Sequence, residues 1–290
     1  MKNLDLSTLP AKKRKQIVSC LRAGIQLLYF LFLPSVFTAA FNGVKYIFTQ
    51  LGQGEKIEMT AFVSALLLVC AFTIVFGRFF CGFACAFGSL GDAMHAIYGI
   101  ICKKRKKKPR RIKPELAKKL ALVKYGILLL IALCCFAGVY QKARGTSPWD
   151  VFSMLHAGNF RLSSYIPGIV LLVLILVGMF FEERFFCRFL CPMGAVFSLL
   201  PILPFFTLHR KRENCIRGCS ACTRQCPSAV ELPSDGYVEI SGDCFQCQKC
   251  IDTCPRMNIH CGLPGIKGNE VVLTLIRALI LLGLFIWLGI

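Results

Sequence analysis

Long apolar runs, separated by short polar or charged segments, dominate the pattern of the chain. Five of them lie at about residues 17–40, 59–76, 120–140, 166–181 and 271–290. A helix needs roughly 20 mostly apolar residues to cross a bilayer. The fourth run has no charged residue, and Arg277 in the fifth lies near enough to its start to reach back to the interface. The pattern predicts an all-α polytopic membrane protein with about five transmembrane helices, in preference to five core helices of a soluble protein.

The basic residues are distributed unevenly between the two sides that this arrangement defines. With the N-terminus inside, the loops 41–58 and 141–165 lie outside and hold only five of the 35 Lys and Arg residues. Cytoplasmic loops carry the excess of positive charge in membrane proteins. We therefore expect a multi-pass protein of the bacterial cytoplasmic membrane, with a cytoplasmic N-terminus and an outside C-terminus.

The formal net charge of +20 could also indicate a nucleic-acid partner. Its densest run, Lys103–Lys113, has no aromatic or hydrogen-bonding neighbours of the kind that such a surface needs. A basic segment beside a membrane helix is typical of an anchor for anionic lipid headgroups. We expect lipid, and no nucleic acid, as its partner.

An eleven-residue motif occurs twice, as RFFCGFACAFG at residues 78–88 and RFFCRFLCPMG at residues 184–194, with seven identical positions. Each copy follows the second helix of a pair, so we expect two parallel membrane repeats whose motifs both end on the cytoplasmic side. A two-fold axis along the membrane normal would bring four cysteines together: Cys81, Cys85, Cys187 and Cys191.

The spacing of these cysteines indicates their chemistry only in part. Residues at i and i+4 share one face of a helix, so each C-x3-C pair can present two sulfurs together. Four thiolates suit an iron–sulfur cluster or another soft metal, but two redox-active dithiols or small buried residues fit the same pattern. The motif alone leaves these alternatives open.

A second cysteine cluster lies between the fourth and fifth apolar runs. Most of the 18 cysteines fall in tight groups, which excludes a secreted disulfide scaffold with cysteines spread through its loops. Two runs of four cysteines, each ending in Cys-Pro, match the bacterial two-cluster pattern, in which the fourth cysteine of each run binds the other cluster. The prediction is one [4Fe–4S] cluster on Cys215, Cys219, Cys222 and Cys254, and a second on Cys244, Cys247, Cys250 and Cys226.

A zinc site is the alternative interpretation of closely spaced cysteine pairs, but two complete runs of four cysteines, each ending in Cys-Pro, favour cubane clusters. The first run departs from the usual spacing by one extra residue between its first two cysteines, and residues 236–240 are expected to form a short strand. The module is therefore an α+β ferredoxin-like domain inserted into the membrane protein.

These features divide the chain into five predicted parts. Residues 1–101 form the first membrane repeat and residues 102–119 a basic cytoplasmic linker. Residues 120–208 form the second repeat, residues 209–268 the cytoplasmic two-cluster domain, and residues 269–290 the fifth transmembrane helix.

Twin C-x3-C(P) motifs after paired helices, followed by a two-cluster module, resemble the NapH/NosR-type membrane iron–sulfur proteins over about residues 17–262. The resemblance implies that electrons move between quinol or a cytosolic donor, the clusters, and a partner across the membrane. Two departures weaken any transfer of a specific substrate: Ala86 replaces the proline of the first motif, and a fifth helix follows the module.

The resulting hypothesis is an electron-transfer subunit of an oxidoreductase system of the quinol dehydrogenase kind. Its redox partner would be a flavin or haem carrier, or a cytosolic ferredoxin or flavodoxin. Asp92 and His95 are candidates for a quinone site, because a histidine can hydrogen-bond a quinone oxygen and a carboxylate can take its proton. The alternative is an assembly factor that reduces copper for a respiratory enzyme, with the twin cysteines as its metal site.

Overall fold

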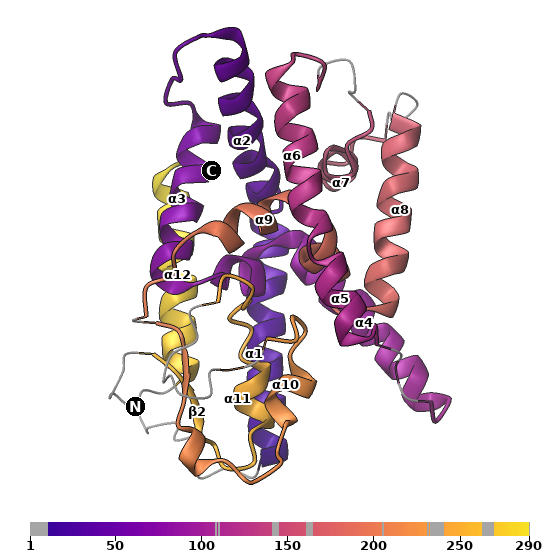
Figure 1. The fold of residues 1–290 in the computed structure, drawn as a ribbon, viewed down its shortest axis with the longest axis vertical. Coiled ribbons are helices and arrows are strands. Elements are labelled where there is room, and N and C mark those ends of the chain that lie inside the picture. The colour runs from indigo at the N-terminus through magenta and orange to yellow at the C-terminus, as the bar shows by residue number, and fades with distance from the viewer. Residues whose placement is uncertain are drawn as a thin grey trace.

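The computed structural model is mostly helical and describes residues 11–107, 109, 111–140, 145–160, 165–204, 206–230, 232, 241–262 and 270–289. Its helices form a bundle at one end of the long axis, and a small cysteine-rich module lies at the other end (Figure 1). The predicted strand at residues 236–240 lies outside the described residues.

The first apolar run is longer and more bent than the sequence indicates. Helix α1 (Ala11–Phe32) and helix α2 (Val36–Gln53) meet at an angle of 62°. Pro34 lies in the break, where it removes a backbone donor and disfavours helical geometry in the residue before it. The bend leaves α1 beside the cysteine-rich module and directs α2 into the bundle (Figure 1).

Helix α3 (Ala61–Phe76) returns antiparallel to α2 and packs along it. Thr60 caps its first turn, because the hydroxyl accepts a hydrogen bond from the Val63 amide at 3.3 Å. The second repeat contains α5 (Pro114–Leu120), α6 (Val123–Phe136) and α8 (Ile166–Phe181), and α6 also packs on α2. A short helix, α7 (Pro148–His156), lies between α6 and α8 and has no counterpart in the described part of the first repeat.

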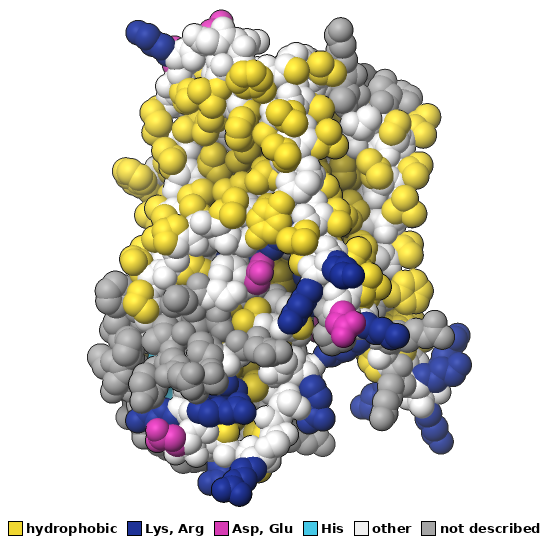
Figure 2. Space-filling model, viewed as in Figure 1, with side chains coloured by type: hydrophobic (Ala, Val, Ile, Leu, Met, Phe, Trp, Pro, Cys, Tyr) yellow, Lys and Arg dark blue, Asp and Glu magenta, His cyan; other side chains and the backbone are white. Residues whose placement is uncertain are grey.

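Large apolar side chains cover the outside of the bundle, where water would disfavour them (Figure 2). They come from several helices, and include Phe32, Leu67, Leu130, Leu174 and Leu279, each more than half exposed. Such a surface fits lipid, and the protein is a membrane protein.

Helix length supports fewer membrane crossings than the five apolar runs of the sequence. Residues 115–136 and α12 (Glu270–Trp287) are each long and apolar enough to span a bilayer, and the bent α1–α2 pair makes a third span if it counts as one. Helices α3 and α8 are apolar but have only 16 residues each. The five-span count and the five domain boundaries stay predictions.

Both cysteine motifs break regular helix geometry in the same way. Each forms a five-residue π-helical turn, η2 (Phe80–Ala84) or η5 (Phe186–Leu190). The turn is followed at once by helix α4 (Ala86–Lys104) or helix α9 (Pro192–Leu199). The expected single helical face is therefore wrong in detail, because the second cysteine of each pair leaves the turn in an extended conformation and caps the next helix.

The cysteine-rich module is built from short elements on a two-stranded antiparallel sheet. Strand β1 (Leu208–Arg210) pairs with β2 (Ile259–Cys261), so that His209 lies opposite His260. Between them come η6 (Arg212–Asn214), α10 (Ala221–Gln225) and α11 (Lys249–Thr253), and α10 packs against α11.

Arg277 in α12 corrects one expectation. It does not reach back to the interface; its side chain is fully buried in the protein, with the guanidinium 4.8 Å from the Phe79 ring centroid. The ring face supplies a favourable environment for the buried cation.

Candidate metal centres

The first predicted set of cysteines shares one cavity. Cys215, Cys219, Cys222 and Cys254 line one space, although Cys254 lies far along the chain from the other three. Two polar side chains donate toward their sulfurs: Asn258 lies 3.6 Å from Cys215 Sγ, and Arg210 lies 3.5 Å from Cys222 Sγ. The backbone N–H of Asn258 donates a third hydrogen bond, to Cys254 Sγ at 3.4 Å. The cysteine pattern gave no signal for these two residues.

The second set shares a neighbouring cavity, lined by Cys226, Cys244, Cys247 and Cys250. The crossover arises because α10 and α11 pack side by side, and the cysteine at the end of each short helix reaches the cavity of the other run. Cys222 lines both cavities, so the two sites adjoin.

These thiols suit a cluster better than a single ion. Among the described residues, no three His, Cys, Asp or Glu side chains converge closely enough to hold one metal ion. The thiolates of a cubane bind different iron atoms at alternate corners, and so they stand further apart than the ligands of one ion. Burial raises the pKa of Cys250 and of Cys226, so deprotonation there needs the compensation that a bound metal supplies.

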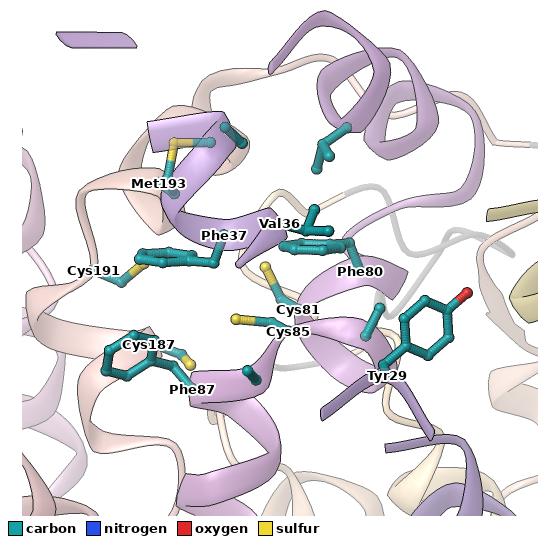
Figure 3. Packing of buried hydrophobic residues seen from close by; sticks show 14 of the residues in the cluster. Tyr29, Val36, Phe37, Phe80, Cys81, Cys85, Phe87, Cys187, Cys191 and Met193 are labelled. Carbon is teal, nitrogen blue, oxygen red and sulfur yellow. The ribbon is translucent and has the colours of Figure 1, made fainter. Parts of the chain in front are cut away.

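The four cysteines of the twin motifs also come together, and all four are buried. In Figure 3, Cys81 and Cys85 of one motif point across a small space toward Cys187 and Cys191 of the other. Phe37 and Phe87 lie beside this space, with their ring centroids 5.3 Å apart. Apolar walls of this kind exclude water from the sulfurs.

The two motifs have matching backbone geometry. The Cys85 amide donates to the Phe80 carbonyl at 2.8 Å, and the Cys191 amide donates to the Phe186 carbonyl at 2.9 Å. Cys191 also accepts a hydrogen bond on Sγ from the Gly194 amide, at 3.1 Å. The sequence repeat is thus a local structural repeat, whereas the membrane two-fold axis stays a prediction.

Each motif contributes a buried arginine that crosses to the other motif. Arg184 donates to the Cys81 carbonyl and, at 3.0 Å, to the Gly82 carbonyl. A methyl group at Gly88 would meet Arg184 Nη1 at 2.5 Å, and one at the equivalent Gly194 would meet Arg78 Nη2 at 3.0 Å. Glycine at both positions therefore makes room for the arginine of the opposite motif.

The loop of the second cavity docks directly on this exchanged pair. Phe245, next to Cys244, stacks with Arg78 and Arg184, whose guanidinium carbons lie 4.7 Å and 5.6 Å from the ring centroid. Arg78 also donates to the Gly242 carbonyl at 3.0 Å. The second ferredoxin site and the twin-cysteine site thus share one interface.

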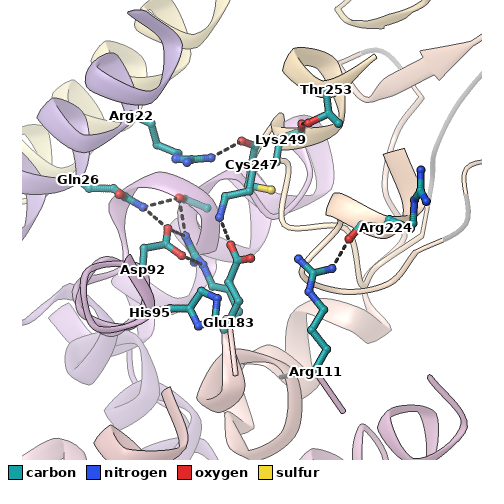
Figure 4. Close-up of polar contacts among 12 residues, drawn as sticks. Arg22, Gln26, Asp92, His95, Arg111, Glu183, Arg224, Cys247, Lys249 and Thr253 are labelled. Atoms are coloured by element: carbon teal, nitrogen blue, oxygen red, sulfur yellow. Dashed lines mark hydrogen bonds and ion pairs between the residues drawn. The ribbon is translucent and has the colours of Figure 1, made fainter. Parts of the chain in front are cut away.

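Two further contacts fix the same loop on neighbouring helices. Lys124 at the start of α6 pairs with Asp243 at 2.6 Å, and Arg22 of α1 donates to the Cys247 carbonyl at 3.1 Å. Figure 4 shows Arg22 together with the ion pair that joins Lys249 to Glu183. Burial lowers the pKa of Lys249 to about 8.

The structure separates the two quinone-site candidates. Asp92 is partly buried, accepts hydrogen bonds from Arg184 at 2.6 and 2.9 Å, and accepts one from Gln26 at 2.8 Å (Figure 4). His95 instead lines an open cavity of about 1150 Å³ between the module, α5 and the basic linker. Its Nδ1 lies 3.3 Å from the Phe180 carbonyl, and burial lowers the pKa of the imidazole.

Comparison with known proteins addresses the membrane part of the chain. A family model described as a 4Fe-4S binding domain matches residues 59–109 and 166–207. Each matched segment holds one of the twin motifs and none of the eight cysteines of the ferredoxin module.

Three curated relatives show how widely the similarity extends. An uncharacterised protein of Methanocaldococcus jannaschii is 26% identical over 83% of this chain and 93% of its own length. The putative electron transport protein YccM of Escherichia coli is 26% identical over 66% of this chain and 54% of its own length. The ferredoxin-type protein NapH of Haemophilus influenzae is 24% identical over 66% of this chain and 64% of its own length.

The chain is similar to the NapH/NosR-type membrane iron–sulfur proteins over about two thirds of its length. The resemblance drawn from the cysteine motifs is thereby confirmed, and so are the iron–sulfur, electron-transport and membrane features expected from it. No solved structure matches the chain significantly.

Proposed function

We propose that this protein carries electrons between a cytosolic donor or the quinone pool and a partner redox protein on the other side of the membrane. The supporting observation is the single interface at which the 242–247 loop of the second ferredoxin site packs on the twin motifs. A redox centre in the module and one in the membrane part would then be immediate neighbours.

The eight cysteines of the module would hold two [4Fe–4S] clusters, in the two crossed sets whose cavities are described above. Their donor chemistry fits, because four thiols line the first cavity and five line the second, with Cys222 shared, and no three of the described His, Cys, Asp or Glu side chains converge on one ion. When bound, such clusters supply one-electron transfer at a potential that hydrogen bonds and charge adjust. Arg210 and Asn258 would supply these hydrogen bonds at the first site.

The other residues position these sites and keep water from them. Lys124, Arg22 and the stacked Phe245 hold the second site against the bundle. The aromatic side chains around Cys187 and Cys191 separate the twin site from the lipid and from water. No bond-making step by a side chain is needed in such a protein.

The charge distribution supports a cytoplasmic module and N-terminus with an outside C-terminus. Figure 2 shows Lys and Arg side chains gathered around the module and the linker, whereas the opposite part of the face is mainly apolar. Electrons from a cytosolic donor would therefore enter at the module and leave through the bundle.

Quinone is a candidate exchange partner at the open cavity that is lined by His95 of α4 and by Tyr125 near the start of α6. The cavity also contains the basic residues Arg111, Lys118 and Lys124, which favour an anionic reduced state. Asp92 is already the ion-pair partner of Arg184, so we assign it to the scaffold of this site and His95 to its lining.

Transmembrane electron transfer can be measured in sealed vesicles that carry the purified protein and enclose a membrane-impermeant electron acceptor. With dithionite outside, vesicles whose module faces outward should reduce the acceptor. The Cys226→Ala/Cys254→Ala variant should lose this transfer, while the variant Cys102→Ala, at a buried cysteine of α4 that lines neither ferredoxin cavity, should retain it. Equal rates with and without protein would contradict the proposal.

The same preparation tests the copper-reducing alternative. Stoichiometric copper that disappears in Cys81→Ser/Cys187→Ser would favour an assembly role. Wild-type protein without copper, but with cluster-dependent transfer, would favour the electron-transfer role.

A further inference from the structure

Arg78 and Arg184 are two fully buried guanidinium groups at the twin-cysteine site, each 1% exposed. Arg184 is well balanced, because Asp92 accepts two of its hydrogen bonds and the Cys81 and Gly82 carbonyls accept others. Arg78 is different. Its Nη1 reaches the Gly242 carbonyl, but its Nε and Nη2 have no carbonyl, carboxylate or hydroxyl partner among the described residues.

The nearest carboxylate does not complete the environment of Arg78. Asp243 lies 3.7 Å from Arg78 Nη1, is half exposed, and already binds Lys124 at 2.6 Å. A buried cation without a buried anion carries a large desolvation cost. A buried anion beside the Nε and Nη2 atoms of Arg78 would therefore offset this desolvation cost.

The surroundings of Arg78 indicate where this partner lies. Its Nη2 packs against Gly194 at the start of α9, one turn from Cys191 Sγ. Its charge also acts on the sulfur of Cys81 in its own motif. The unpartnered atoms of Arg78 thus belong to the space that the four cysteines surround.

Neutral forms of the four cysteines leave this charge unmatched. Four protonated thiols carry no charge, and neither do two disulfides. Thiolates bound to a metal–sulfur centre keep a net negative charge that two guanidinium groups can balance.

The spacing of the sulfurs then selects between kinds of centre. All four cysteines are among the described residues, and no three of them converge to the distance that an ion with three or four ligands, such as zinc, requires. We propose that the four cysteines of the twin motifs hold an iron–sulfur centre across the two repeats, with Arg78 and Arg184 as its exchanged counter-ions. This inference deepens the proposed function and rests on it, because it identifies the redox group on the bundle side of the interface.

Iron and sulfide content of the anaerobically purified full-length protein is the first test. Two module cubanes account for about eight irons per chain, so a third centre raises the count above eight. We expect Cys81→Ser/Cys187→Ser to return it to about eight and to remove one EPR signal while the module signals remain. The control Cys70→Ser/Cys135→Ser changes cysteines of α3 and α6 outside the motifs and should keep the wild-type iron count.

About eight irons in both wild type and the twin-motif variant would overturn the inference, yet the proposed function would stand if the module signals were present. Absence of the module signals as well would instead refute the proposed function. Alkylation of the unfolded protein tests the disulfide alternative, because cysteines in a disulfide do not react. Two disulfides at the twin motifs would overturn the inference.

The role of the arginines needs a readout beyond iron content. Arg78→Met removes the charge but keeps much of the apolar volume, whereas Arg78→Lys keeps the charge. A cation stabilises the more negative, reduced state of the centre. We therefore expect Arg78→Met to move the midpoint potential of the twin-site signal to more negative values, and Arg78→Lys to keep it close to the wild-type value.

Arg188→Met is the matched control, because it removes a cation of the second motif that pairs with Glu182. It should shift the twin-site potential less than Arg78→Met. Equal potentials in wild type, Arg78→Met and Arg78→Lys, at unchanged iron content, would overturn the counter-ion role.

Discussion

The module cavities and the twin-cysteine site accommodate thiolates in two different ways. In the module, cysteines lie on loops and on the short helices α10 and α11, several are partly exposed, and neighbouring Arg210 and Asn258 donate toward their sulfurs. At the twin site, all four cysteines are buried in or just after the two π-helical turns among phenylalanines, and the nearby charge comes from two crossed arginines. Polar donors suffice near water, whereas an apolar interior requires full counter-charges.

The crossed pairing of the module gives the largest expected effect. Cys254→Ala should remove the first cluster, about half of the module's eight irons, although Cys254 belongs to the second run of cysteines. Because metal binding and folding are coupled, the module should also become sensitive to protease. Iron analysis and limited proteolysis measure both.

Cys261→Ala is the control for this prediction. Cys261 is a buried cysteine on β2 that lines neither cavity. Loss of the second cluster's signal with retention of the first in Cys254→Ala would show that the crossover is wrong.

Phe245 links the two kinds of site, so its removal should act on both. Phe245→Ala leaves a cavity between Arg78 and Arg184, and such truncations cost about 3–5 kcal/mol. The module should therefore be cleaved faster in limited proteolysis, by the factor that this loss of stability predicts. Phe160→Ala, at a side chain 76% exposed, should leave protection at the wild-type level.

Gly88→Ala tests the arginine exchange from its opposite side. The added methyl group would meet Arg184 Nη1 at 2.5 Å, and overpacking of this kind costs about 1–3 kcal/mol. Gly99→Ala in the same helix has no atom within 4 Å of the new methyl group and should stabilise α4 by up to about 1 kcal/mol. Thermal unfolding in detergent compares the two, and equal midpoints would argue against the close contact.

The smallest effect is expected at a single sulfur contact. Asn258→Ala removes donors to Cys215 and the Lys211 carbonyl, worth about 1 kcal/mol together. The first cluster should remain bound with a more negative potential, because a hydrogen bond to sulfur stabilises the reduced state. Asn214→Ala, at an exposed neighbour, should leave the potential unchanged.

The sequence predicts the cysteine sites better than their surroundings. Spacing alone groups Cys226 with Cys244, Cys247 and Cys250, and the structure places all four on one cavity. For Cys81 and Cys187, the sequence predicts only that a two-fold arrangement of the repeated motif would bring them together, and in the structure they lie close together. The ligand assignments themselves stay predictions.

Three features depend on long-range packing and have no local sequence signal. The π-helical turns place Cys85 and Cys191 at helix caps, whereas i, i+4 spacing suggests a regular helix. The burial of Arg277 depends on Phe79, which is nearly 200 residues away. The bend at Pro34 has a local cause, but its direction depends on the helices that pack around it.

The exchange of arginines constrains the two copies of the motif together. Each copy of the motif supplies both the guanidinium and the glycine gap that receives it, which is the property of a self-complementary, isologous interface. Two copies of a single such unit would form the same contacts across a two-fold axis. Within this chain the arginine of each half is matched to the glycine of the other, so a larger residue at either glycine requires a change in the arginine of the opposite motif, whereas Ala86 and Pro192 differ between the two copies without involving this contact.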